Sequence, residues 1–163
     1  MVPVCEPMAQ RWQMKYASSR GYGSLKLQHD VAQMIRHRRE RYGQTSIVYF
    51  VSDHDPSGLD LQQAWEEALR DFGAMAIVMR IGLTREQVTD SDLSEQLQQG
   101  IEVKPSDSRA AKYVAAHGDR CWEVDILPAA VIAQAIDDHI ESWRDVALWH
   151  RRSQEIDQAR SLL

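Results

Sequence analysis

Two aspartates, Asp53 and Asp55, are separated by one residue and follow directly after the apolar segment 46–51. Carboxylate oxygens are the ligands that Mg²⁺ prefers, and one or two of them complete its shell together with water and substrate phosphate. Pro56 and Gly58 favour a stiff, tight turn, on which two carboxylates can point toward one cation. The spacing therefore indicates a site for Mg²⁺, or for Mn²⁺, at Asp53 and Asp55.

The same two aspartates have other interpretations. As turn and cap residues they would only accept hydrogen bonds from the backbone of the helix expected to begin near Ser57. One of them could instead be a phosphatase nucleophile, since such an aspartate also follows a strand. A calcium-binding EF-hand loop is disfavoured, because its twelfth position would be Ala64 and Pro56 interrupts the pattern.

Two more acidic residues, Glu123 and Asp125, stand at the end of a candidate strand at residues 120–124. If that strand lies beside segment 46–51, their oxygens would add to the metal site; otherwise they cap the loop that follows. His54 alternates away from its two aspartate neighbours, so we expect its side chain to face solvent rather than to bind a ligand.

Basic residues supply candidates for phosphate contact. Three of them stand in expected loops: Arg20, Lys104 and Arg109. The densest basic run, residues 36–41, stands at the end of an expected helix, where positive charge is favourable with the helix dipole whatever its function. That run is either a solvated surface or a phosphate-binding patch.

The segments that flank the aspartates predict how they are positioned. Residues 46–51 and 74–81 are predominantly apolar, which is typical of strands buried on both faces of a parallel sheet. Between them, apolar residues recur at helical spacing up to Gly73. A strand, a helix and a strand joined by short links predict a right-handed βαβ unit, and ligands of open sheets bind at the carboxyl ends of the strands.

Further elements surround this unit. Helices are expected at residues 6–12, 25–41 with Ser24 as N-cap, 84–87, 90–100 in part, and 107–117, and a short strand at 13–18. Apolar residues then form one long helical stripe: Ile132, Ile136, Ile140, Trp143 and Ala147. Together they predict an α/β fold with a mostly parallel sheet flanked by helices over residues 1–128. A long amphipathic helix over residues 129–163 would pack on it or on a partner.

Composition narrows the class of protein. The 163 residues fit one domain, and a net charge of −5 argues against tight autonomous binding to duplex DNA. The two cysteines, Cys5 and Cys121, form neither a disulfide framework nor a zinc pattern. The sequence has no signal-like start and no apolar run long enough to span a bilayer, so we expect a cytoplasmic protein without a membrane partner.

A family resemblance is carried by residues 47–60, which read IVYFVSDHDPSGLD. This segment resembles the second acidic motif of Toprim domains, in the form found in the topoisomerase VI A subunit and in bacterial and phage Toprim-like proteins. The supporting segments, in chain order, are 20–24 (RGYGS), 80–84 (RIGLT), 107–109 (DSR) and 121–128 (CWEVDILP). The resemblance spans roughly residues 5–140.

The resemblance implies a Rossmann-like fold and Mg²⁺-dependent phosphoryl transfer on nucleic acid, with Asp53 and Asp55 as metal ligands. It also implies a catalytic glutamate at the end of a first strand, for which Glu6 is the candidate. Residues 6–12 look more like the helix that follows such a strand. On that interpretation the first strand and its glutamate are missing, and the domain is truncated or half of a split system.

Two functions are compatible with these patterns. One is an Mg²⁺-dependent domain that cleaves DNA, as a nuclease or topoisomerase-related fragment. The other is a non-catalytic interaction module that keeps the fold. A sheet that lacks a strand exposes an edge, so we expect a homo-oligomer or a partner that supplies the strand.

Overall fold

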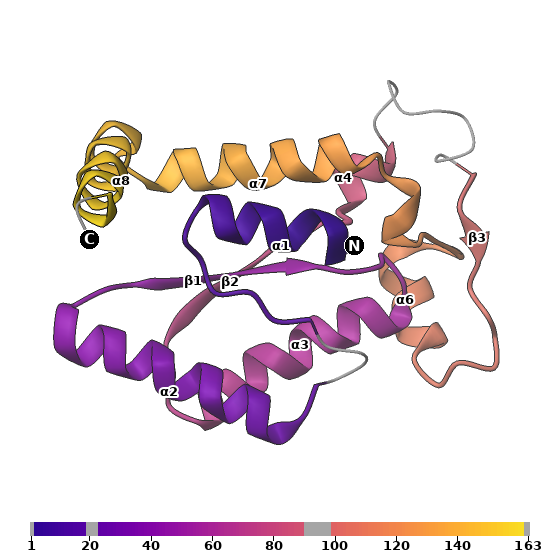
Figure 1. The fold of residues 1–163 in the computed structure, drawn as a ribbon. Coiled ribbons are helices and arrows are strands. Elements are labelled where there is room, and N and C mark those ends of the chain that lie inside the picture. The colour runs from indigo at the N-terminus through magenta and orange to yellow at the C-terminus, as the bar shows by residue number, and fades with distance from the viewer. Residues whose placement is uncertain (1, 19–22, 90–98, 162–163) are drawn as a thin grey trace.

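The computed structural model describes residues 2–18, 23–89 and 99–161. Two expectations lie outside these residues: the turn that contains Arg20, and most of the helix and loop at 90–100. The described chain is a mixed α/β fold in which a small parallel sheet of two strands is covered by helices (Figure 1).

The βαβ unit forms where the sequence predicts it. Strand β1 (Ser46–Val51) is followed by helix α3 (Pro56–Asp71) and strand β2 (Ala76–Gly82). The two strands pair in parallel from Ser46 opposite Ala76 to Val51 opposite Gly82, with an irregularity between Phe50 and Val51. The carboxyl end of β1 thus leads directly into the segment that carries Asp53 and Asp55.

Helix α2 (Leu25–Tyr42) precedes this unit and has the predicted ends. The Ser24 hydroxyl accepts a hydrogen bond from the backbone N–H of Leu27, and Gly43 closes the helix in the left-handed conformation at φ 64°. The helix expected at 84–87 is α4 (Arg85–Thr89), and it begins with a capping box. Thr84 and Gln87 exchange backbone-to-side-chain hydrogen bonds of 2.8 and 3.2 Å.

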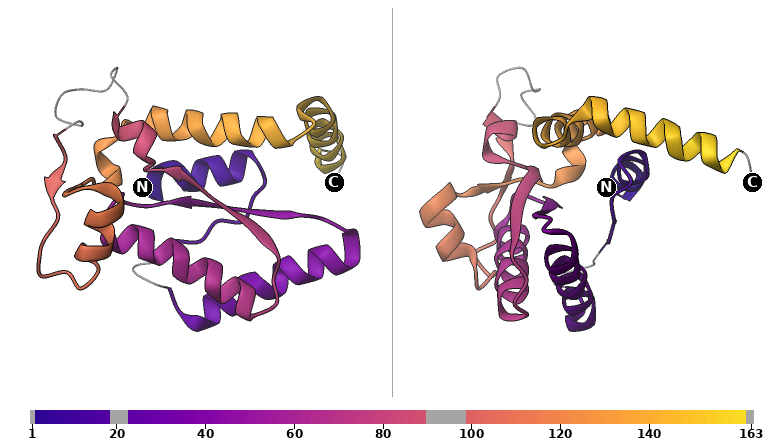
Figure 2. Two further views of the ribbon diagram at one scale, coloured as in Figure 1. Left: turned by 180° about the vertical axis from the view of Figure 1, so that it is seen from behind. Right: turned by 90° about the vertical axis from the view of Figure 1, so that its left-hand side faces the viewer.

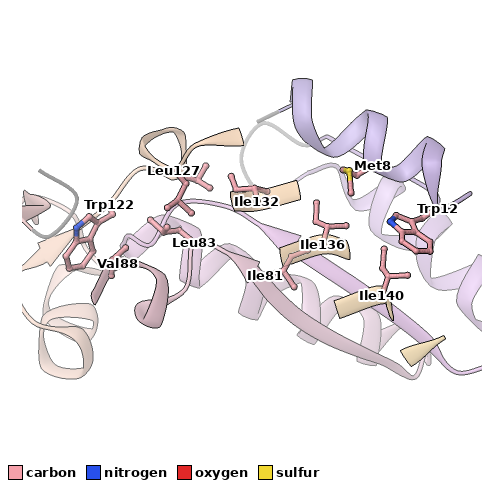
Figure 3. Packing of buried hydrophobic residues seen from close by; sticks show 11 residues of the cluster. Met8, Trp12, Ile81, Leu83, Val88, Trp122, Leu127, Ile132, Ile136 and Ile140 are labelled. Carbon is pink, nitrogen blue, oxygen red and sulfur yellow. The ribbon is translucent and has the colours of Figure 1, made fainter. Parts of the chain in front are cut away.

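The helices form layers on the two sides of the sheet (Figure 2). Helices α1 (Val2–Arg11) and α7 (Ala129–Trp143) lie on one side, and α2 and α3 on the other. The main core lies under α7, whose predicted stripe of Ile132, Ile136 and Ile140 is buried against residues of α1 and β2 (Figure 3). A smaller core, which includes Ile35 of α2 and Leu69 of α3, lies on the opposite face.

The α/β class is confirmed, but the mostly parallel sheet is not. The candidate strand at 120–124 is the short β4 (Arg120–Cys121), and it pairs antiparallel with β3 (Ile101–Glu102) instead of extending the parallel sheet. Trp122 and His54 add one antiparallel bridge beside it. Residues 14–18 form no strand. Helix α6 (Ala110–His117) and the 3₁₀ turn η1 (Val124–Ile126) complete this end of the molecule.

The sequence predicted one long C-terminal helix, but the structure has two, α7 and α8 (Val146–Arg160). Arg144 lies at the junction, where its guanidinium stands 5.8 Å from the ring of Trp12 and 5.9 Å from that of Trp149. The two indoles contact each other with centroids 4.9 Å apart. Trp143, expected on the buried stripe, is 55% exposed because the helix ends there. None of the described helices has the length and apolar character needed to cross a membrane.

Candidate functional site

The loop between β1 and α3 places both aspartates in structural hydrogen bonds. Asp55 is the N-cap of α3, and its Oδ1 accepts from the backbone N–H of Gly58 at 2.5 Å. Asp53 Oδ1 accepts from the backbone N–H of Val124 at 2.8 Å. The capping interpretation is therefore correct for Asp55, and Asp53 joins the end of β1 to the 3₁₀ turn η1.

The side chain of Arg80, in β2, donates hydrogen bonds to the backbone of this loop. Its guanidinium donates to the carbonyls of Ser52 at 3.0 Å, Asp53 at 3.1 Å and Gly58 at 2.8 Å. Its Nε donates to the side chain of Gln62 at 3.0 Å. Burial lowers the pKa of Arg80, and the negative charges of Asp55 and then Asp53 act in the opposite direction. The loop backbone is thus fixed by a partly buried cation.

Glycine is required at position 58 for a steric reason. A Cβ there would collide with the backbone carbonyl of Asp53 and would stand 3.1 Å from Asp55 Oδ1. The loop therefore folds back on the first turn of α3 so closely that no side chain fits. This contact explains why the turn after the aspartates contains Gly58.

One oxygen of each carboxylate remains available for a ligand. Within the described residues, Oδ2 of Asp53 and Oδ2 of Asp55 have no hydrogen-bond partner, and both side chains are partly exposed. Two carboxylate oxygens match the minimum protein contribution to a magnesium site, with water and phosphate as the other ligands. The described residues hold no group of three or more His, Cys, Asp or Glu side chains arranged for a metal. The loop thus offers two carboxylate oxygens of the chemical type that Mg²⁺ prefers.

Glu123 and Asp125 flank the residue that binds Asp53. Both side chains are exposed, Glu123 just before η1 and Asp125 within it, and the hydrogen bond from Val124 to Asp53 joins this turn to the end of β1 although β4 does not pair with β1. The buried Cys121 also reports the local charge. Its pKa is raised by burial first, and then by Asp55, Glu123 and Asp53. Three carboxylates, opposed by the positive charge of Lys104, thus act on this thiol.

His54 is buried, and the prediction that it faces solvent is wrong. Its side chain is 3% exposed, and its Nδ1 lies 2.8 Å from the hydroxyl of Tyr113. That hydroxyl also lies 3.0 Å from the carbonyls of His54 and Arg120, to either of which it can donate. Because a hydroxyl has one proton, we assign the proton of neutral His54 to Nδ1. Burial lowers its pKa to about 4, and the charge of His117 adds to the effect.

The remaining predicted residues lie in different places. Glu6 is exposed within helix α1 and does not end a strand. Lys104 is exposed after β3. Arg109 is engaged by carboxylates, since its Nε lies 2.9 Å from Asp107 and its Nη1 lies 3.8 Å from Asp60. Arg20 lies outside the described residues.

Three important residues were not singled out from the sequence: Arg80, Tyr113 and His117. A signal existed for Arg80, because it is the one charged residue in the apolar run 74–81 and a buried charge needs partners. Tyr113 and His117 gave no signal, because their contacts with His54 join positions more than 50 residues apart.

Comparison with known proteins gives no match: no family model, no curated protein and no solved structure matches this chain.

Proposed function

We propose that this chain is a Toprim-like domain with a Rossmann-like fold that binds Mg²⁺ through Asp53 and Asp55 and acts in phosphoryl transfer on nucleic acid, with DNA as the substrate. It works in the cytoplasm as a homo-oligomer or with a partner that supplies further catalytic groups. The ion would offset phosphate charge and position the scissile group. Glu123 and Asp125, on either side of the Val124 whose N–H binds Asp53, would bind its water ligands.

A single observation carries the proposal. Two partly exposed carboxylates at the carboxyl end of a parallel strand each keep one oxygen without a partner among the described residues, on a loop that Arg80 and Gly58 hold in place. A residue needed only as a cap or a turn does not require its neighbours to be fixed in this way. Preorganised oxygens instead reduce the cost of binding a cation that loses water reluctantly.

The test separates charge from hydrogen bonding. Asp53→Asn and Asp55→Asn keep Oδ1 as an acceptor for Val124 and Gly58, but each removes one negative charge. We expect Mg²⁺-dependent cleavage of a labelled single-stranded or duplex DNA by the wild-type chain and its loss in both variants. Asp145→Asn, at the exposed N-cap of α8, is the matched control. Cleavage that survives both loop substitutions would contradict the proposal.

A second candidate is a non-catalytic interaction module. It is favoured by the small sheet, in which β1 and β2 are both edge strands, and by exposed Met75 and Ile77 at the start of β2. An open edge with apolar neighbours is a site for strand addition. Here Asp53 and Asp55 would serve only as loop and cap residues.

Sedimentation distinguishes this candidate. A module that pairs through the sheet edge should form a dimer that weakens when Ile77→Lys introduces a charge on that edge. Ile156→Lys on the exposed face of α8 is the control. A monomer at every concentration would count against the module, and a dimer with no cleavage activity would support it over the enzyme.

A further inference from the structure

A cavity whose lining includes neither Asp53 nor Asp55 lies beside α4, the end of α6 and β4. It has a volume of about 330 Å³ and is lined by Arg85 and Val88 of α4, by His117 at the end of α6, and by Asp119, Arg120 and Trp122 around β4. The ring of His54, which stands between the two aspartates in the sequence, lies 5.3 Å from the ring of His117 and 5.8 Å from that of Trp122, two residues that line the cavity. The volume is in the range of small-ligand sites, roughly 300–1,000 Å³.

The lining of this cavity is basic in a chain of net charge −5. Its lining includes two arginines and one histidine but one acidic residue, Asp119, whose Oδ1 lies 3.9 Å from the Nε of Arg120. The carbonyl of His117 is the one hydrogen-bond acceptor that the described residues offer Arg85, at 3.0 Å. Since a guanidinium has five N–H donors, Arg85 keeps donors for a ligand.

The buried ring of Trp122 lines the cavity and positions the guanidinium of Arg85. Trp122 is 4% exposed and lies next to Val88 (Figure 3). The guanidinium of Arg85 stands 5.4 Å from the centroid of the Trp122 ring, so a cation covers the indole. The indole also contacts Gly100, where a Cβ would stand 2.7 Å from Trp122 Cε2, so the ring is held between α4 and the residue before β3.

We propose that this cavity binds a phosphate group, held by Arg85 and Arg120 with His117 as a further donor. A tetrahedral anion with several acceptor oxygens matches two guanidinium groups better than a base or a sugar does. Burial lowers the pKa of His117, and the positive charges of Arg85 and then Arg80 lower it further, so a bound anion would raise it again. The site goes beyond the proposed function, because it needs neither the metal nor the carboxylates of Asp53 and Asp55.

Inorganic phosphate without any divalent cation is the probe. We expect the ring signals of His117 in an NMR spectrum of the full chain to shift with saturation, and its pKa to rise when phosphate binds. Chloride at equal ionic strength should give no such shift. Arg85→Gln and Arg120→Gln should each weaken phosphate binding about tenfold or more, as expected for the loss of a charged hydrogen bond. Arg160→Gln, on exposed α8, removes the same charge and should leave binding unchanged.

Competition by two dinucleotides then shows whether the bound group is a backbone phosphodiester or a terminal phosphate. A dinucleotide with a 5′-phosphate and one without it should both compete if the site takes a backbone phosphodiester, and only the first if it takes a terminal phosphate. Asp53→Asn should bind phosphate as the wild type does, so failure of the metal proposal leaves this result intact. Shifts that do not saturate, or equal affinity in Arg85→Gln, Arg120→Gln and the wild type, would overturn the phosphate site.

Discussion

Asp53 Oδ1 accepts a hydrogen bond from the backbone N–H of Val124 at 2.8 Å, and this contact joins two segments 71 residues apart. It is the link through which the end of β1 and the acidic turn η1 become neighbours. The same carboxylate keeps its second oxygen without a partner among the described residues, so one side chain combines a structural role with a free ligand atom.

Asp53→Ala should destabilise the fold. The N–H of the buried Val124 would lose its acceptor, at a cost of about 1–3 kcal/mol in the free energy of unfolding. Asp53→Asn should stay close to the wild type, because its amide oxygen can accept the same bond. Urea unfolding of the three proteins measures this difference. If Asn is as destabilising as Ala, the charge near Arg80 matters more than the hydrogen bond.

Asp55→Ala should lower the free energy of unfolding by about 0.5–2 kcal/mol, the usual value of a helix N-cap. Asn is an equally good cap and should restore it. Asp145, which caps α8 through the N–H of Leu148, provides the comparison. Because no residue of α8 is buried, Asp145→Ala should have a smaller effect on global unfolding than Asp55→Ala.

Arg80→Met should be the most damaging of the loop substitutions. It would remove the guanidinium hydrogen bonds to the carbonyls of Ser52, Asp53 and Gly58, although the Ser52 carbonyl keeps its bond from the N–H of Leu83, at a total cost of about 3 kcal/mol. Lysine should not rescue it, since one ammonium group cannot span three acceptors as a guanidinium does. Arg70→Met, on the exposed side of α3, is the control. Equal stability of the Arg70→Met and Arg80→Met proteins would contradict the role given to Arg80.

His54 should make the fold sensitive to acid. Its pKa is about 4 in the folded chain and near 6.5 when exposed, so the unfolded state binds the proton first as the pH falls. Stability should therefore decline between about pH 6.5 and pH 4, by up to about 3 kcal/mol from this group. His54→Asn should show a shallower decline in unfolding experiments across that interval. An identical slope in both proteins would show that other groups cause the acid sensitivity.

The sequence predicted the elements better than their assembly. The βαβ unit, the caps at Ser24 and Gly43, and the isoleucine stripe of α7 depend on local patterns, which a sequence displays directly. The antiparallel pairing of β4 depends on a partner strand two residues long, which has no pattern of its own. The break between α7 and α8 was hidden because the apolar spacing continues across Arg144.

The candidate site was predictable in its location and not in its surroundings. A DxD segment after a buried strand identifies the two carboxylates, and position in the sheet follows from the βαβ pattern. The burial of His54 could not be inferred, because strand alternation does not continue through a turn. The contact partners of His54, namely Tyr113, His117 and Trp122, come from α6 and β4, whose packing depends on the whole fold.

The most direct test of the metal site is a binding titration with Mn²⁺, followed by electron paramagnetic resonance of the free ion, on the wild type, Asp53→Asn and Asp55→Asn. All three chains keep the hydrogen bonds to Val124 and Gly58, so their folds are comparable. We predict one site in the wild type that Mg²⁺ displaces, and affinity at least about tenfold weaker in each variant, as expected for a lost carboxylate ligand. Equal Mn²⁺ binding by all three chains would contradict a metal site at Asp53 and Asp55.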